Sequence, residues 1–563
     1  MPTRRAFLRR SLAAVPAALA APAMLRAQAA VPGRKPAAKE LAADLVIIGG
    51  GTGACAAALA AARHGLSVIM TEETDWIGGQ LTSQAVPPDE NALIETTGGT
   101  RSYQDFRTRV RAYYARSFPL TAAARANPAL NPGNGSVSRL CHEPRVALAV
   151  LEEMLAPFVA SGRVRVLRRH TIAQAFADRD RVSLLTVTNR ESGHEIGLTA
   201  PLFLDATELG DLLPLTKTEY VIGYESRRDT GEERAPAEAQ PHNHQAFTCC
   251  FAMDYLHGED HTIERPHGWA FWRDHVPKLN PPWPGKLLDL FYSQPRTLKP
   301  FNYGFDPQKG TGLFRYRRIL DRTNFAPGTY RGDITLVNWP QNDYMLGNLC
   351  EVTPAEAARH LDAAKQLSLS WLYWLQTACP RPDGGTGWKG LRLRPDIVGT
   401  EDGLAKYPYV RESRRIRAEF TVTENHVGTA ARAKLTGKPE AEVSAEPFTD
   451  SVGIGSYAID LHPSSGGDNY IDFPARPFQI PLGALIPRRM ENLLPACKNL
   501  GVTHLTNGCY RLHPVEWNIG EAVGELAAFC HTKKEPPRAV RAKPALLADY
   551  QAQLRASGIP LAW

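Results

Sequence analysis

Several features that define other protein classes are missing from this sequence of 563 residues. It holds nine cysteines, but no Cys-x-x-Cys pair, so the spacing typical of zinc and iron–sulfur sites does not occur. Beyond the first 29 residues no apolar run approaches the ~18 residues that a membrane-spanning helix needs. There is also no internal repeat, and the sequence therefore does not predict a repeat architecture.

The composition is that of a folded globular protein. Hydrophobic residues make up 43% of the chain and charged residues 22%, which argues against disorder and against a coiled coil. The length exceeds what one ordinary core fills and predicts two or three structural units. With an odd number of cysteines, at least one thiol has no partner within the chain, and we expect most of them to be small buried side chains.

The first 29 residues have the pattern of a twin-arginine signal peptide. Arg4-Arg5 precede a short apolar run, and Ala27-Gln28-Ala29 matches a small-x-small cleavage site. This predicts that the twin-arginine export machinery carries the folded protein to the periplasm or the medium. The segment holds five arginines and no acidic residue, so cleavage lowers the formal net charge from +7 to +2. A nucleic-acid-binding surface is therefore not predicted.

A strand, a glycine-rich turn and a helix are expected at residues 44–64, followed by a second strand at 66–70. Gly49, Gly51 and Ala54 fit the dinucleotide fingerprint G-x-G-x-x-G/A. Glycine at the first two positions permits the tight turn and the close approach of backbone N–H groups to a pyrophosphate, which the helix N-terminus also attracts. The predicted cofactor-binding residues of this turn are Gly49, Gly51, Thr52, Gly53 and Ala54.

Two further features strengthen the fingerprint. Glu72 ends the second expected strand, where an acidic side chain accepts hydrogen bonds from ribose hydroxyls, and Gly78-Gly79 follow it. A second glycine pattern, at residues 453–458, is rejected because a Ser/Gly loop rather than a helix follows it. One fingerprint predicts one bound dinucleotide and no separate NAD(P)H domain.

Beyond the fingerprint, most of residues 44–530 resemble the FAD-dependent oxidoreductase family with two dinucleotide-binding domains, and in particular an exported bacterial branch sometimes labelled "xanthan lyase". The stretch Asp205-Ala206-Thr207 resembles the family's Asp-Ala-Thr-Gly turn, although Glu208 stands where the family has glycine. The resemblance implies FAD as the cofactor and places Asp205, Ala206, Thr207, Arg511 and Gly520 near it. The closing segment, from about residue 492 to 520, is expected to reach the flavin ring.

The expected fold is α/β, with a Rossmann-type FAD-binding domain that is split in the sequence and an inserted α+β substrate domain. The expected boundaries are a signal peptide at 1–29, a linker at 30–43, the two parts of the FAD-binding domain at 44–220 and 471–530, an inserted domain at 221–470, and a C-terminal tail at 531–563. The insert is predicted from its many tryptophan, tyrosine and proline residues and its scarcity of periodic runs.

Four side chains are candidates for catalysis. Histidine is the usual base for an alcohol or amine substrate, and His504 and His513 lie in the closing segment. His462 lies two residues after Asp460, so both side chains are expected on one face of an extended strand. Arg415 is a candidate for binding an anionic substrate or the flavin. Each of these residues is also compatible with a structural role, and no metal site is predicted.

The sequence therefore predicts an exported FAD enzyme that acts on a small molecule, with an alcohol, amine or C–C bond as the oxidised group. Its electrons are expected to pass to an unidentified acceptor other than NAD. Two alternatives remain open at this point: a flavin-containing, lyase-like enzyme acting on carbohydrate, and a flavin-binding protein without catalysis.

Overall fold

The computed structural model describes residues 39–563, so the expected signal peptide and residues 30–38 of the expected linker lie outside it. Its centre is a five-stranded parallel sheet with the order β25-β8-β2-β3-β4. These strands are β2 (Leu45–Ile48), β3 (Val68–Glu72), β4 (Val164–Arg168), β8 (Leu202–Asp205) and β25 (Leu493–Pro495). The predicted α/β class is confirmed, and the sheet is completed by a strand from the C-terminal part of the chain.

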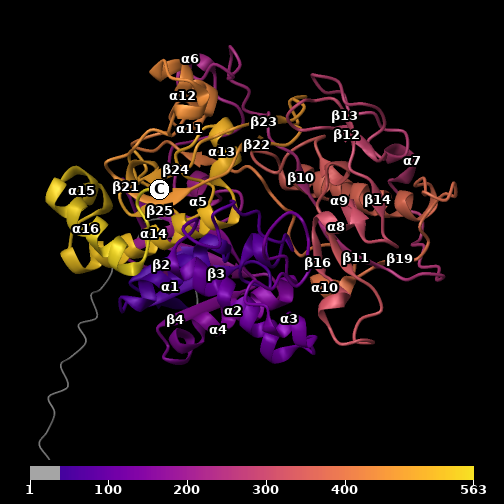
Figure 1. Cartoon of the computed structure of the whole chain (residues 1–563). Helices are drawn as coiled ribbons and strands as arrows, with labels where there is room; N and C mark the ends of the chain where they lie inside the picture. The colour runs from indigo at the N-terminus through magenta and orange to yellow at the C-terminus, as the bar shows by residue number, and fades with distance from the viewer. Residues whose placement is uncertain (1–38) are drawn as a thin grey trace, which may run out of the picture.

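Two helices from opposite ends of the sequence cover this sheet together. The alanine-rich α1 (Thr52–Arg63) contacts α14 (His513–Lys533), and Figure 1 shows the yellow α14 beside the indigo α1. The backbones meet at two glycines: a Cβ on Gly520 would lie 1.9 Å from the carbonyl oxygen of Gly53. The absence of side chains at this point lets the two helices approach closely. The other long helices of this part are α2 (Arg101–Ser117) and α4 (Pro144–Ala160).

A second sheet lies beside the first, with the order β1-β7-β6-β5. Its strands are β1 (Glu40–Ala42), β5 (His170–Asp178), β6 (Arg181–Asn189) and β7 (Glu195–Thr199). The strand β1 falls within the segment at 30–43 that is expected to be a linker. Its backbone nevertheless pairs in parallel with β7. The end of that segment is therefore part of the folded protein.

The middle of the chain forms a region with its own sheet and its own buried cluster, on the right of Figure 1. The sheet has the order β16-β17-β11-β19, from Arg318–Leu320, Ile334–Val337, Phe251–Tyr255 and Leu391–Leu393. Beside it runs α9 (Pro354–Thr377), whose N-cap is Thr353: the Thr353 side chain accepts a hydrogen bond from the backbone of Glu356. Trp339 and Trp371 are fully buried in this cluster.

The end of the expected insert is structured differently from its middle. β21 (Ser451–Gly455) pairs with β24 (Phe478–Pro481) across the boundary expected at 470, and β21 contacts α14. β22 (Ile459–Leu461), β23 (Ile471–Phe473) and α13 (His504–Tyr510) lie nearby, and no helix follows β21, in agreement with the rejection of its glycine pattern. The expected C-terminal tail forms α15 (Pro537–Ala542) and α16 (Pro544–Ser557), in which Tyr550 is buried and donates a hydrogen bond to the carbonyl of Ala522.

The cysteines follow the expectation of small buried residues. All nine are free thiols, and every one except the half-buried Cys530 is buried. Within residues 39–563 we find no helix with the length and apolar character needed to cross a membrane.

Candidate functional site

A cavity of about 330 Å³ opens at the carboxyl ends of β2, β3 and β8, where ligands bind in open parallel sheets. We call it the dinucleotide pocket. Of the residues predicted to bind the cofactor, six line it: Gly49, Gly51, Glu72, Gly79, Ala206 and Thr207. The fingerprint, the strand-end acid and the family turn are far apart in sequence, and the sheet brings them to one edge.

The glycines of this pocket are required by close backbone approaches. Gly49 has φ +96°, and a Cβ there would lie 2.2 Å from the carbonyl oxygen of Ala206. A Cβ on Gly79 would lie 2.9 Å from the Cα of Gly51. The two glycine turns therefore face each other across a cradle that side chains would fill. Such a cradle at the N-terminus of α1 fits a pyrophosphate, which backbone N–H groups and the helix dipole stabilise.

Glu72 lies at the carboxyl end of β3, on the wall of the dinucleotide pocket. Its Oε1 accepts hydrogen bonds from the backbone and the hydroxyl of Thr74, at 2.7 and 2.6 Å, which fixes the carboxyl group at the end of β3. Burial raises the pKa of Glu72 to about 7. These contacts leave the second oxygen, Oε2, to accept a bond from a sugar hydroxyl.

The remaining predicted cofactor residues support the pocket from behind or lie elsewhere. Thr52 donates to the carbonyl of Gly78 at 2.9 Å, and Asp205 accepts from the backbone and side chain of Thr207 at 3.0 and 2.7 Å. Gly53 and Gly520 form the contact between α1 and α14. Five of the predicted residues thus act in the turns or in packing and a sixth, Ala54, is fully buried in the core, whereas Arg511 lines a different pocket. The six supporting residues are Thr52, Gly53, Ala54, Gly78, Asp205 and Gly520.

The structure also shows an ion pair, not revealed by the sequence, that borders the dinucleotide pocket. Glu208, the residue that departs from the family turn, pairs with Lys498, which is 1% exposed. Burial lowers the pKa of Lys498, but Glu208 and Glu516 raise it above its ordinary value. The acidic residue in place of the turn glycine is the one sequence signal from which a compensating cation could have been inferred.

A second cavity, of about 560 Å³, lies between the part built around the parallel sheet and the middle region. We call it the tyrosine pocket because its walls include Tyr292, Tyr303, Tyr316, Tyr409, Tyr457 and Tyr470. Three buried arginines also line it, Arg317, Arg411 and Arg511, from well-separated parts of the chain. Asp460 and His462 both line it as well, which confirms that the two side chains share one face.

The two pockets are neighbours. Tyr407 lines the dinucleotide pocket and Tyr409, two residues later, lines the tyrosine pocket. Gln80 follows the second glycine turn and joins the two sites: its Oε1 accepts from the Tyr409 hydroxyl at 3.2 Å, and its Nε2 donates to the carbonyl of Arg511 at 3.0 Å. Gln80 thus links the second glycine turn to two residues, Tyr409 and Arg511, that line the tyrosine pocket.

His462 is the only one of the four predicted catalytic residues that lines either described pocket. Its Nδ1 lies 2.5 Å from Oδ2 of the fully buried Asp343, and its Nε2 lies 3.8 Å from Asp460. Burial and the charge of Arg411 lower the pKa of His462, while Asp343 acts in the opposite direction. A neutral imidazole held by a carboxylate and facing a cavity can accept a proton from a bound molecule.

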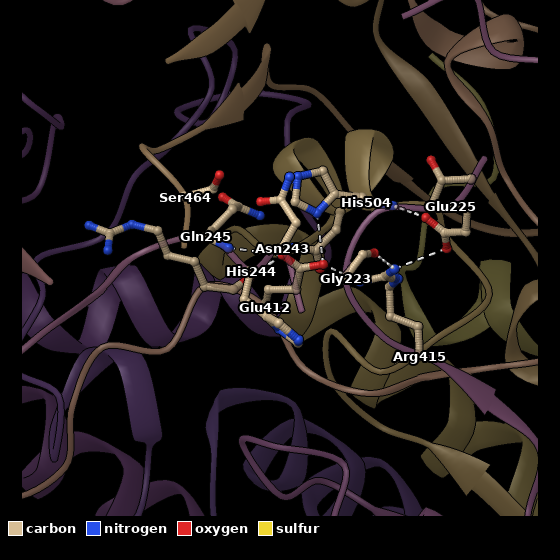
Figure 2. A network of polar contacts seen from close by, with 12 residues as sticks. Gly223, Glu225, Asn243, His244, Gln245, Glu412, Arg415, Ser464 and His504 are labelled. Atoms are coloured by element: carbon tan, nitrogen blue, oxygen red, sulfur yellow. Dashed lines mark hydrogen bonds and ion pairs between the residues drawn. The ribbon is translucent and has the colours of Figure 1, made fainter. Parts of the chain in front are cut away.

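His504 and Arg415 belong to a buried ionic network instead (Figure 2). His504 Nδ1 lies 2.9 Å from the Glu412 carboxylate, and Arg415 pairs with both Glu412 and Glu225. Burial raises the pKa of Glu412, but His504 and Arg415 lower it well below its usual range. His504 also stacks on Tyr224, with the ring centroids 4.2 Å apart. These contacts are those of residues that fix α13 and its neighbours in place.

His513 is fully buried at the start of α14. Its Nδ1 accepts a hydrogen bond from the backbone N–H of Asp89 at 3.1 Å, and burial lowers its pKa to about 3. The side chain is therefore neutral at physiological pH. As for metals, the described part of the chain holds no group of three or more His, Cys, Asp or Glu side chains suited to binding an ion.

Comparison with known proteins agrees with this geometry. A family model described as FAD dependent oxidoreductase matches residues 44–554. No curated protein matches the chain.

Several solved structures are similar to the chain at low identity. They include L-proline dehydrogenase from P. horikoshii (14% identity, 34% of this chain and 25% of that chain, TM-score 0.17). A second is the quinol fumarate reductase FrdA of E. coli (11% identity, 92% of this chain and 74% of that chain, TM-score 0.31). A third is a geranylgeranyl bacteriochlorophyll reductase-like protein from Thermoplasma acidophilum (9% identity, 92% of this chain and 85% of that chain, TM-score 0.31). Similarities at these scores carry no argument about function. The family model, which spans most of the chain, shows that the protein belongs to the FAD-dependent oxidoreductases and that its cofactor is FAD.

Proposed function

We propose that this FAD-dependent oxidoreductase is exported and acts as a dehydrogenase or oxidase on a small molecule bound in the tyrosine pocket. The observation that carries the proposal is the position of His462. It faces a cavity that adjoins the dinucleotide pocket, and Asp343 holds its ring. Electrons then leave to an acceptor other than NAD, since the sequence contains a single dinucleotide fingerprint.

The residues present fit FAD. The Gly49–Gly51 turn and Gly79 form a cradle for the pyrophosphate, and Glu72 is available to the ribose. When bound, FAD supplies two-electron chemistry by accepting a hydride from a substrate carbon. The protein contributes position and a proton path: Nε2 of His462 takes the proton from the substrate hydroxyl or amine, and Asp343 stabilises the imidazolium that forms.

We further propose that the middle region is the substrate domain. It supplies Tyr292, Arg317 and Asn338 to the tyrosine pocket, whereas Asp89 and Arg511 come from the parts around the parallel sheet. A substrate bound there lies between the two regions, which is a common place for enzyme pockets.

The first test is the absorption spectrum of the purified protein. Flavin bands that bleach when a substrate is added without oxygen support a dehydrogenase or oxidase. Glycan cleavage without net bleaching favours a lyase-like reaction instead, and bound flavin that no substrate changes favours a binding protein. Protein that folds with FAD supplied and yet retains none contradicts the proposal.

Export is tested separately. Arg4→Lys with Arg5→Lys removes the twin-arginine pattern while keeping the charge. We expect the unchanged protein in the periplasmic or secreted fraction and the double variant in the cytoplasm. Equal distribution of the two proteins contradicts twin-arginine export.

A further inference from the structure

The walls of the tyrosine pocket are rich in buried hydrogen-bond donors. Arg317, Arg411 and Arg511 are 7%, 1% and 3% exposed. Each has one carboxylate nearby: Asp89 at 3.2 Å from Arg317, Asp343 at 2.9 Å from Arg411, and Asp460 at 3.5 Å from Arg511. The pairs of Arg317 and Arg511 are longer than a charge-assisted hydrogen bond, which spans about 2.7–2.9 Å. These two guanidinium groups are therefore incompletely paired.

The polar atoms of the pocket walls that lack a hydrogen-bond partner are all donors. Among the described side chains that line the pocket, the buried atoms without a hydrogen-bond partner are Nε of Arg411, Nε of Arg511 and Nδ2 of Asn338. All three are N–H donors, and two of them belong to cations. A buried donor without an acceptor costs about 1–3 kcal/mol, more when charged, so such groups are usually satisfied in the working protein.

Asn338 links these donors to the pocket. Its Oδ1 accepts a hydrogen bond from Nη2 of Arg411 at 3.0 Å, and its backbone carbonyl accepts one from Nε of Arg317 at 3.2 Å. Its free amide group therefore lies beside two arginines, with His462 in the same cavity. An acceptor with two oxygens matches this set, because guanidinium groups bind carboxylates through paired N–H bonds.

From this arrangement we infer that the substrate carries a carboxylate, which Arg411, Arg511 and Asn338 bind in the tyrosine pocket. The tyrosine rings around the cavity contact the body of the molecule, and the oxidised group faces His462. This inference rests on the proposed function, since it assigns the substrate class of the same site.

The test uses two matched pairs of probes that differ by the carboxylate: D-glucuronate with D-glucose, and benzoate with benzyl alcohol. Binding is measured by the thermal unfolding midpoint and by perturbation of the flavin spectrum, neither of which requires turnover. We expect at least one acid to bind at least tenfold more tightly than its neutral counterpart. Equal binding of acid and alcohol, or no binding of either acid, overturns the inference.

The Asn338→Asp variant locates the binding. It keeps the oxygen that Arg411 contacts and replaces the free donor by a negative oxygen, so acid binding should fall at least tenfold. Asn127→Asp, at an exposed position, adds the same charge elsewhere and should leave acid binding unchanged. Acid binding that survives in the Asn338 variant places the site elsewhere and overturns the inference.

A second variant covers the case in which the first does not fold. Arg511→Gln removes a charge whose recorded contacts are long, at 3.1–3.5 Å, and it should also lower acid affinity at least tenfold. An unchanged affinity counts against the inference. Loss of flavin from the unmodified protein would contradict the proposed function instead, while the thermal shift with acids would still report on this pocket.

Discussion

Nδ1 of His462 lies 2.5 Å from Oδ2 of Asp343, although His462, which follows the strand β22, is 119 residues from Asp343 in the sequence. Asp343 is also held by Arg411 and by the Thr248 hydroxyl, so its position is fixed before any ligand binds. The carboxylate therefore orients the ring and stabilises its protonated form.

If His462 is the base, His462→Asn should lower kcat by about 10²–10⁴-fold while the protein keeps its flavin and its unfolding midpoint. Steady-state kinetics with an artificial electron acceptor, once a substrate is found, measures this. His267→Asn, at an exposed histidine, is the matched control and should retain full activity. An active His462 variant rules out the assignment.

Glu72→Gln should weaken FAD binding about tenfold, because a neutral amide accepts hydrogen bonds from hydroxyls less strongly than a carboxylate. Since burial raises the pKa of Glu72 to about 7, the difference between the two proteins should grow as pH rises through 7. Fluorescence titration of the apoprotein with FAD gives both values. Glu195→Gln changes an exposed residue of β7 in the same way and should leave the FAD affinity of the unmodified protein unchanged.

Gly520→Ala should destabilise the protein by about 1–3 kcal/mol, the usual cost of overpacking, or more because the obstacle is backbone. The added Cβ would meet the carbonyl oxygen of Gly53 at 1.9 Å. Denaturant unfolding of the two proteins measures the change. At Gly285 a Cβ meets no atom within 4 Å, so Gly285→Ala should be nearly neutral; equal effects at the two sites would refute the packing argument.

Arg415→Met should cost about 3–5 kcal/mol, because it leaves the buried Glu412 carboxylate without its cation. The same change at Arg331, whose pair with Glu259 is exposed, should cost less than about 1 kcal/mol. Comparison of the two variants by denaturant unfolding separates a structural network from a surface pair. A stable Arg415 variant with altered substrate binding would return this residue to the active site.

His513 predicts a loss of stability in acid. Burial lowers its pKa to about 3 from an ordinary value of 6.5, so between these values the unfolded chain binds a proton that the folded chain does not. Its contribution is complete above pH 6.5 and declines as pH falls, by up to about 1.4 kcal/mol per unit. His513→Gln should flatten the dependence of the free energy of unfolding on pH between 6 and 4. An unchanged slope would mean that His513 titrates normally.

Local sequence patterns identified the elements of the dinucleotide pocket. The fingerprint at Gly49 and Gly51 requires a strand, a tight turn and a helix that are contiguous in the chain, and Glu72 follows at a fixed distance. Where the controlling interactions are local, the sequence was a sufficient guide.

Long-range contacts explain what the sequence left undecided. The sequence around Lys498 does not indicate that this lysine pairs with Glu208. Likewise, the sequence around His504 does not indicate that this histidine contacts Glu412 rather than a cavity. β1 was assigned to the linker because its partner, β7, lies more than a hundred residues later.

The sequence by itself thus determined the family, the cofactor fingerprint and the chemical types at hand, since these depend on residues close together in the chain. Only the tertiary structure decided which histidine faces a cavity and which is enclosed by charge. That choice depends on burial and on partners brought together by the whole fold: His462 and Asp343 meet at the tyrosine pocket, while His504 and Arg415 are taken up by Glu412.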